Sequence, residues 1–221
     1  VSWKVNTRTL SVKLDNNTVI NQENFDLSSI LDTSSATYGF VGATGNATNE
    51  QYFYPVLAES NYYDGNLLSN YSFESDLTDW TTDNAVTRSD DPTPHSGNSY
   101  LVGAVNNSAT SHTFQRINLI DKGFNSNDID SGLFNVNYGG WQSGWNTQKD
   151  SGKIEITFND GTSDLVSYDL GWFYSNHTWT LQEATVNLPA GARFIIYNFY
   201  TQRYEGSNCD GYLDDAFVII Q

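Results

Sequence analysis

The sequence predicts an all-β protein, and three observations lead to that class. Aromatic residues make up 14% of the 221 residues, and aromatic side chains favour the pleated, half-buried surfaces of sheets. Alternating or β-branched runs bounded by Asn, Asp and Gly recur along the whole chain. Helical periodicity is nearly absent, and the one short helical turn that we expect covers residues 27–31.

The alternating runs place strands over most of the chain. We expect them at residues 9–14, 37–44, 51–57, 100–105, 112–119, 132–138, 153–158, 164–170, 178–186, 193–200 and 211–220. Between two of them lies Asn159-Asp160-Gly161. Because Asp-Gly tolerates positive φ, this triplet predicts a hairpin with a tight type I′ turn.

The strand pattern divides the chain into two domains. Turn-forming residues interrupt the aromatic pattern at 58–66. Residues 66–221 are long enough for one complete β-sandwich. Residues 1–60 would make only a marginal core alone. We therefore expect this first region to complete itself against the second domain, a neighbouring subunit or sequence upstream of Val1.

The charge and cysteine content exclude several classes of protein. Acidic residues outnumber basic ones by 26 to 10, a formal net charge of -16, which repels phosphate backbones and disfavours a nucleic-acid partner. Two explanations of the charge remain open: a solvated acidic surface, or neutralisation by Ca²⁺. No stretch approaches the ~20 apolar residues that span a bilayer, so we expect no membrane insertion. The single cysteine, Cys209, excludes an internal disulfide and leaves a buried thiol or an intermolecular partner.

Two stretches of the first region share a pattern with a known family. They are Thr-Leu-Ser-Val at 9–12 with Asp-Leu-Ser-Ser-Ile-Leu at 26–31, and Tyr-Gly-Phe-Val-Gly-Ala-Thr-Gly at 38–45 followed by Asn49 and Glu50. With them, residues 3–57 resemble the final strands of L-type, legume-like lectin domains. The resemblance places that family's metal ligands and most of its sugar contacts upstream of these residues. It therefore implies a partial lectin-like β region for residues 1–60.

The second region carries a longer set of family motifs. They are Asn-Leu-Leu-Ser-Asn-Tyr-Ser-Phe-Glu at 66–74, Leu-Thr-Asp-Trp at 77–80, His-Ser-Gly at 95–97, Tyr-Leu-Val at 100–102 and Gly-Tyr-Leu-Asp-Asp-Ala-Phe-Val at 211–218. In this order, residues 66–221 resemble the jelly-roll carbohydrate-binding modules and the related galactose-binding-like domains. The resemblance implies a jelly-roll β-sandwich whose first strand begins at Asn66. Residues 114–220 also resemble F-box-associated sugar-recognition domains, whose aromatic pair falls at Ser207 and Asn208 here.

A glycine-rich segment at 138–146 is the first candidate for a sugar site. Sugars present C–H faces and hydroxyl edges, so their sites combine aromatic rings with planar hydrogen-bonding groups. Both kinds occur in what we expect to be a loop, as Tyr138, Trp141, Gln142, Trp145 and Asn146. In the alternative, Trp141 or Trp145 caps the hydrophobic core.

A second candidate loop covers residues 200–208. Its Arg203, Tyr204 and Glu205 offer an aromatic ring and two charged groups to sugar hydroxyls. Three other tryptophans lie within or beside strand patterns, and we expect them in the core: Trp80, Trp172 and Trp179.

The resemblance to carbohydrate-binding modules also implies a structural Ca²⁺. It is held by an early acidic residue and by the Asp before the last strand, which correspond to Glu74 with Asp214 or Asp215. Carboxylate oxygens are the ligands that Ca²⁺ prefers. In the alternative, Asp215 caps a turn or pairs with Arg193. No EF-hand or zinc pattern occurs, because the three histidines, at 95, 112 and 177, are scattered.

Five Asn-x-Ser/Thr triplets are candidates for glycosylation in a eukaryotic secretory pathway. They begin at Asn16, Asn46, Asn70, Asn106 and Asn176. About five such triplets would occur by chance in a chain of this composition, so the extracellular or cell-surface location that we expect rests more on the composition and the resemblances.

No motif singles out a catalytic site, since neither a nucleophile with its base nor a defined carboxylate pair can be identified. We therefore expect a non-catalytic carbohydrate-binding or adhesion module of a larger surface or secreted protein, with a glycan or polysaccharide as its partner. The alternative is a structural subunit of an extracellular filament or surface layer. In that case the strand edges of the first region would pair with a neighbouring subunit.

Overall fold

The computed structural model describes residues 2–4, 9–14, 17–22 and 65–221. The chain divides into two compact units, Val1–Asn61 and Tyr62–Gln221. In the first unit, three antiparallel strands form a sheet in the order β1-β2-β3. Their bounds are Ser2–Lys4, Thr9–Leu14 and Asn17–Gln22. The prediction for residues 9–14 is confirmed, while those for 27–31, 37–44 and 51–57 lie outside the described residues.

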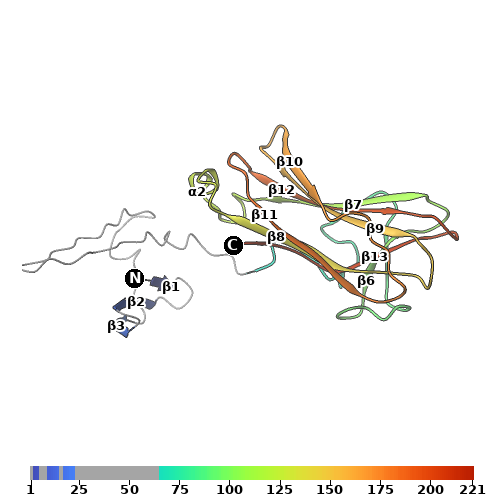
Figure 1. The fold of residues 1–221 in the computed structure, drawn as a ribbon, viewed down its shortest axis with the longest axis horizontal. Coiled ribbons are helices and arrows are strands. Elements are labelled where there is room, and N and C mark those ends of the chain that lie inside the picture. Colours follow the sequence, from blue (N-terminus) through green and yellow to red (C-terminus); the bar gives the residue numbers. More distant parts are fainter. Residues whose placement is uncertain (1, 5–8, 15–16, 23–64) are drawn as a thin grey trace, which may run out of the picture. The chain divides into compact units, whose positions relative to one another are not determined.

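The second unit is a sandwich of two five-stranded antiparallel sheets (Figure 1). We name each sheet after its central strand. The β12 sheet has the order β10-β9-β12-β7-β4, with bounds Asp164–Asp169, Ser151–Asn159, Phe194–Gln202, Thr110–Asn118 and Thr81–Thr82. The β13 sheet has the order β11-β8-β13-β6-β5, with bounds Thr180–Asn187, Asn135–Gly144, Cys209–Ile220, Tyr100–Ala104 and Val86–Arg88. The predicted all-β, jelly-roll class is confirmed.

Between β7 and β8 lies one short helix, α2, at Ser126–Asp130, which the sequence analysis missed. Its N-cap is Asn125, whose side chain accepts a hydrogen bond from the backbone of Asn127, and its buried residue is Ile129. A helix of this length has too few residues for a periodic apolar pattern. None of the described helices is long and apolar enough to cross a membrane.

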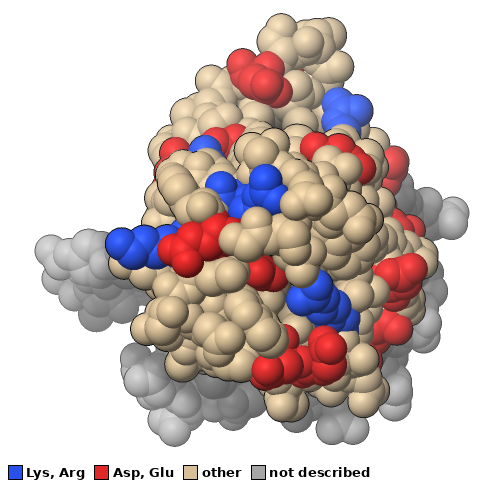
Figure 2. Space-filling view, turned by 90° about the vertical axis from the view of Figure 1, so that its right-hand side faces the viewer, with Lys and Arg blue, Asp and Glu red and all other residues tan. Residues whose placement is uncertain are grey.

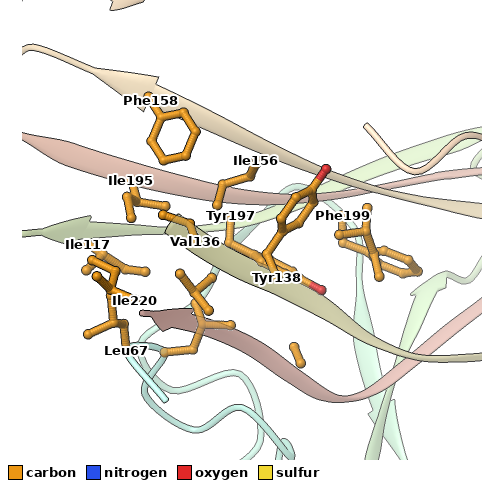
Figure 3. Packing of buried hydrophobic residues seen from close by; sticks show 14 of the residues in the cluster. Leu67, Ile117, Val136, Tyr138, Ile156, Phe158, Ile195, Tyr197, Phe199 and Ile220 are labelled. Atoms are coloured by element: carbon orange, nitrogen blue, oxygen red, sulfur yellow. The ribbon is translucent and has the colours of Figure 1, made fainter. Parts of the chain in front are cut away.

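The core fills the space between the two sheets, and Figure 3 shows side chains from both sheets meeting there. Period-two alternation turns Ile195, Tyr197 and Phe199 of β12 inward, all at most 1% exposed. Tyr138 of β8 lies opposite them. Burial of such side chains is worth roughly 1.5–3 kcal/mol each. The Tyr197 hydroxyl donates to the carbonyl of Gly139 at 2.9 Å, so the phenol is buried without losing a hydrogen bond.

The segment 66–74, predicted as the first strand, is a series of bends and turns. Asn70 and Phe73 have positive φ values of 45° and 57°, a backbone conformation that a strand excludes. The segment is nevertheless anchored to β13, because the Leu67 amide donates to the Val218 carbonyl at 2.9 Å. Leu67 and Phe73 are fully buried. The segment thus contributes to the core without joining a sheet.

The predicted hairpin at residues 159–161 is confirmed, but its type I′ turn is wrong. β9 ends at Asn159 and β10 begins at Asp164, so four residues form the loop. The Asp160 carboxylate accepts hydrogen bonds from the amides of Thr162 and Ser163 at 2.7 and 2.8 Å. This side-chain turn stabilises a longer loop than the two-residue turn that Asp-Gly alone predicts.

The segment 138–146 was predicted as a loop, and that prediction is also wrong, because β8 continues to Gly144. A Cβ atom on Gly139 would lie 2.2 Å from the Gln182 carbonyl oxygen of β11, and one on Gly140 would lie 2.7 Å from the Leu213 side chain. The glycines therefore allow neighbouring strands to approach β8 closely.

Cys209 at the start of β13 is a buried thiol, and burial raises its pKa to about 11.

Candidate functional site

The residues predicted as a sugar site on β8 are divided between the two sides of its sheet. Tyr138 and Gln142 point into the core and are each 1% exposed, so neither side chain is available to a ligand. Trp141 lies on the outer side, where its ring stacks on His95 with centroids 3.9 Å apart. Trp145 packs against the buried group of Tyr100, Val102 and Tyr212, as expected if it caps a hydrophobic cluster. Asn146 is exposed.

The segment 89–98 packs on this outer side of the β13 sheet. The Trp179 indole donates to the Thr93 carbonyl at 2.7 Å, and the Tyr100 hydroxyl donates to the Asp91 carbonyl at 3.0 Å. Trp179 is therefore half-buried beneath a well-bonded segment. The segment covers part of this outer side, where Trp141, Trp145 and Trp179 are half-buried.

The outer side of the β12 sheet combines aromatic and polar side chains, which are partly exposed except for the buried Asn198. Strand register sets Tyr200 of β12 between His112 of β7 and Lys153 of β9. In the next row, Asn198 lies between Phe114 and Glu155. We call these six residues the β12 face: His112, Phe114, Lys153, Glu155, Asn198 and Tyr200.

Two polar groups of the β12 face are fixed by each other. His112 Nε2 lies 2.9 Å from Asn198 Oδ1, and the two atoms form a hydrogen bond in the tautomer that has its proton on Nε2. The Asn198 amide group donates to Thr157 Oγ1 and to the Ile196 carbonyl at 3.4 and 3.3 Å. The His112 ring also stacks on Tyr200 and Phe114, at centroid distances of 4.4 and 5.1 Å. Side chains held in this way lose little freedom when a ligand binds.

A charged pair lies beside this stack. Lys153 Nζ is 3.3 Å from Glu155 Oε2 and 5.0 Å from the ring centroid of Tyr200. The Tyr200 hydroxyl donates to Glu155 Oε1 at 3.4 Å, and burial together with the Glu155 charge raises the pKa of Tyr200. A partly exposed ion pair contributes little to stability. Its effect here is to place a cation, a carboxylate and a phenol at fixed positions on one surface.

Exposed aromatic rings border the β12 face. Trp172, predicted to be in the core, is 48% exposed, and its ring lies 5.7 Å from Lys153 Nζ. The core prediction for Trp172 is thus wrong: the residue lies beyond the end of β10 at Asp169 and follows Gly171, whose φ is 79°. Trp80, by contrast, is buried as predicted and packs against Phe73 at 5.2 Å.

The second predicted loop, between β12 and β13, lies at the right-hand end of the sandwich in Figure 1. Its Tyr204 is 65% exposed, and the phenol oxygen accepts a hydrogen bond from Gln202 Nε2 at 2.7 Å. Gln202 also donates to Ser151 Oγ at 3.0 Å and continues the outward series of Asn198 and Tyr200. The structure therefore brings Tyr204 to the end of the β12 face.

The other two residues predicted in this loop have different environments. Arg203 donates to Asn107 Oδ1 and to the Ser207 carbonyl, both at 3.3 Å, and so ties the loop to the one after β6. Glu205 is exposed, and its backbone amide donates to Asp150 Oδ1 at 3.0 Å.

Sequence reasoning missed five of the six residues of the β12 face, and it included Tyr200 only as the first residue of the second candidate loop. Each strand did carry a signal, because His112, Phe114 and Arg116 alternate with inward residues, as do Asn198 and Tyr200. Aromatic rings on the outward side of a strand are a recognisable exception to the usual alternation. The strand order that brings the three series together cannot be read from one sequence.

The three carboxylates predicted to hold Ca²⁺ meet at the turn of residues 95–99. Glu74 Oε1 accepts hydrogen bonds from the amides of Asn98 and Ser99 at 2.8 and 2.9 Å. Asp214 Oδ2 accepts one from the Ser96 amide at 3.1 Å. Asp215 Oδ2 lies 2.6 Å from His95 Nδ1.

Asp214 is fully buried, and its pKa is raised to about 7 by burial and by the neighbouring Asp215 charge. A buried carboxylate of this kind would gain from a cation. Among the described residues, however, no group of three or more His, Cys, Asp and Glu is placed to hold a metal. Arg193 does not pair with Asp215 and instead forms a bidentate bond with Asp130 at 2.9 Å.

No protein-family model and no curated protein matches this chain. Solved structures do match. A family 61 carbohydrate-binding module in complex with β-1,4-galactotriose is 17% identical with a TM-score of 0.50, and the match covers 71% of this chain and 99% of that one. The enzymatically active domain of tailspike protein 4 from bacteriophage CBA120 is 19% identical with a TM-score of 0.53, covering 73% of this chain and 23% of that one.

At these identities the similarity establishes the fold. The sandwich is of the carbohydrate-binding-module type, and the resemblance of residues 66–221 to those modules is confirmed at that level. The L-type lectin and F-box-associated resemblances stay predictions.

Proposed function

We propose that this chain is a non-catalytic carbohydrate-binding module and that the β12 face, with Trp172 and Tyr204 at its borders, is its binding surface. The observation that carries the proposal is the exposure of these two rings, at 48% and 65%, beside fixed polar side chains. Aromatic rings pack against the C–H faces of sugars, and fixed donors and acceptors bind the hydroxyls. An isolated exposed tryptophan would need no explanation, but two such rings beside one polar surface do.

The charge of the surface favours a neutral glycan. Lys153 and Glu155 compensate each other at 3.3 Å. On the end of the sandwich seen in Figure 2, basic side chains are scattered and several lie beside acidic ones. A polyanion would need a concentrated basic patch. The similar module bound to β-1,4-galactotriose supplies a first neutral probe.

The proposed setting is extracellular, with the module carried by a larger surface or secreted protein. Support comes from the module fold and from the sequence composition. We further propose that no glycosidic bond is cleaved. The carboxylate of Glu155 is occupied by Lys153 and by the Tyr200 hydroxyl, rather than set opposite a second carboxylate across a substrate.

A structural Ca²⁺ at the 95–99 turn also stays a proposal. Glu74 and Asp214 would contribute carboxylate oxygens from the two chain segments that meet there. The cation would neutralise buried charge and tie those segments together.

The test is binding to a glycan array, followed by affinity electrophoresis in β-1,4-galactan. We expect retardation of the wild-type chain, and about tenfold weaker binding after Trp172→Ala or Tyr200→Ala. Trp141→Ala is the matched control, because it removes an indole from the outer side of the other sheet. Absence of binding to every arrayed glycan would contradict the function. Loss of binding in Trp141→Ala alone would contradict the site.

A further inference from the structure

Tyr204 has the highest exposed fraction among the large hydrophobic side chains that the structure describes, 65%. A ring on a loop normally samples several positions, and ordering it costs free energy each time a ligand binds. Tyr204 is instead held at its hydroxyl by Gln202 at 2.7 Å. A second attachment acts on its backbone.

That attachment is Asp150, which is only 2% exposed and precedes β9. Its Oδ1 accepts hydrogen bonds from the amides of Tyr204 and Glu205 at 2.6 and 3.0 Å. Its Oδ2 accepts one from the amide of Asp210 at 3.1 Å. One buried side chain therefore binds both ends of the segment 204–210.

These contacts explain why a carboxylate is buried at this position. Burial of a charge is costly unless hydrogen bonds replace its hydration. Hydrogen bonds from backbone N–H groups to an ionised carboxylate are about twice as strong as neutral ones. The hydrogen bonds of Asp150 also fix the position of the backbone from which the Tyr204 ring projects.

We infer that Asp150 is a positioning residue for glycan binding: it holds the backbone of Tyr204 so that the exposed ring stands ready at the end of the β12 face. The inference rests on the proposed function. Asp150 itself touches no sugar and acts through Tyr204 alone. A ligand thus binds a platform that was ordered in advance.

A double-mutant cycle on the full chain tests this role, with β-1,4-galactan or the strongest array glycan as the probe. Tyr204→Ala and Asp150→Ala should each weaken binding about tenfold. The double variant should bind no more weakly than Tyr204→Ala, because a positioning residue has no effect once the ring is gone. Trp172→Ala combined with Asp150→Ala should instead multiply the two losses.

Asp150→Asn provides a milder change if Asp150→Ala does not fold. The variant removes the charge and places a side-chain NH2 group against the Asp210 N–H, so that this hydrogen bond is lost. We expect at least about twofold weaker glycan binding. This loss should be absent when Tyr204 is replaced by alanine. Wild-type affinity in Asp150→Asn, or a loss that persists without the Tyr204 ring, overturns the inference. So does wild-type affinity in Tyr204→Ala. If the wild-type chain binds no glycan, the proposed function itself has failed.

Discussion

The imidazole of His112 lies almost parallel to the phenol ring of Tyr200, with centroids 4.4 Å apart and planes inclined by 11°. The two residues are direct cross-strand partners on β7 and β12. Such a pair contributes roughly 0.2–1 kcal/mol to a sheet. Because His112 is also hydrogen-bonded to Asn198 at 2.9 Å, the ring supports Tyr200 as part of a fixed surface.

His112→Ala should therefore weaken glycan binding about threefold to tenfold while lowering stability by less than about 1 kcal/mol. The variant removes the ring on which Tyr200 stacks and the donor to Asn198. Isothermal titration calorimetry with the array-selected oligosaccharide measures the first effect, and urea unfolding the second. Unchanged affinity together with a large loss of stability would show that His112 serves the fold and not the binding surface.

The glycosylation candidates should separate according to their side-chain contacts. Asn70 Nδ2 donates to the carbonyls of Asp76 and Thr78 at 2.9 and 3.0 Å, and its Oδ1 accepts from the Ser75 amide at 3.0 Å. A glycan on Asn70 would break these bonds, whereas Asn106 and Asn176 are exposed. After expression in a eukaryotic secretory host, mass spectrometry should find glycan at 106 and 176 and none at 70. Occupancy at Asn70 would show that this turn opens. Asn16 and Asn46 lie outside the described residues.

Asp214 predicts a distinctive dependence of stability on pH. Its pKa in the folded state, about 7, is above its ordinary value of 3.8, chiefly because of burial. The folded state therefore binds the proton more tightly than the unfolded state, and this group makes folding less favourable as pH rises from about 4 to 7. In EGTA, Asp214→Asn should gain stability relative to the wild type across that interval. Urea midpoints at several pH values measure the difference, and a constant difference would contradict the assignment.

Calcium should act on the same carboxylates. If Glu74 and Asp214 hold Ca²⁺, the ion binds only the folded state and stabilises it by mass action, by about 2.7 kcal/mol at a hundredfold excess over Kd. We expect Ca²⁺ to raise the melting temperature of the wild type and to leave that of Glu74→Gln almost unchanged. A wild-type melting temperature that is the same in Ca²⁺ and in EGTA would refute the structural ion.

How far the sequence could be interpreted depended on whether the signal was local. Strand β12 was predicted at 193–200 and lies at Phe194–Gln202, because alternation along one strand is a property of that strand alone. Gly139 and Gly140 favoured a loop at this point of the sequence, but they lie in strand β8. The residues that approach them closely, Gln182 and Leu213, are distant in sequence, so the reason for the glycines was not visible there. The β12 face joins Lys153, Tyr200 and His112 from three separate strands. Only the pairing of those strands reveals it.

Two buried glutamines offer a matched test of the core. Gln142 is 1% exposed, and neither its Nε2 nor its Oε1 has a hydrogen-bond partner among the described residues. Gln115 is 8% exposed, but its Oε1 accepts from the Ser69 amide at 2.8 Å and its Nε2 donates to the Ser69 carbonyl at 3.0 Å. The two side chains thus differ mainly in whether their polar atoms are satisfied.

Methionine has nearly the shape of glutamine without its polar atoms. Gln142→Met should stabilise the protein by about 1–3 kcal/mol, because it removes unsatisfied buried groups. Gln115→Met should destabilise it by a similar amount, because it leaves the Ser69 amide and carbonyl unpaired. Urea unfolding of both variants measures the two free energies of unfolding. Destabilisation in both variants would contradict this account. It would mean that the Gln142 amide has hydrogen-bond partners in solution, for instance a buried water.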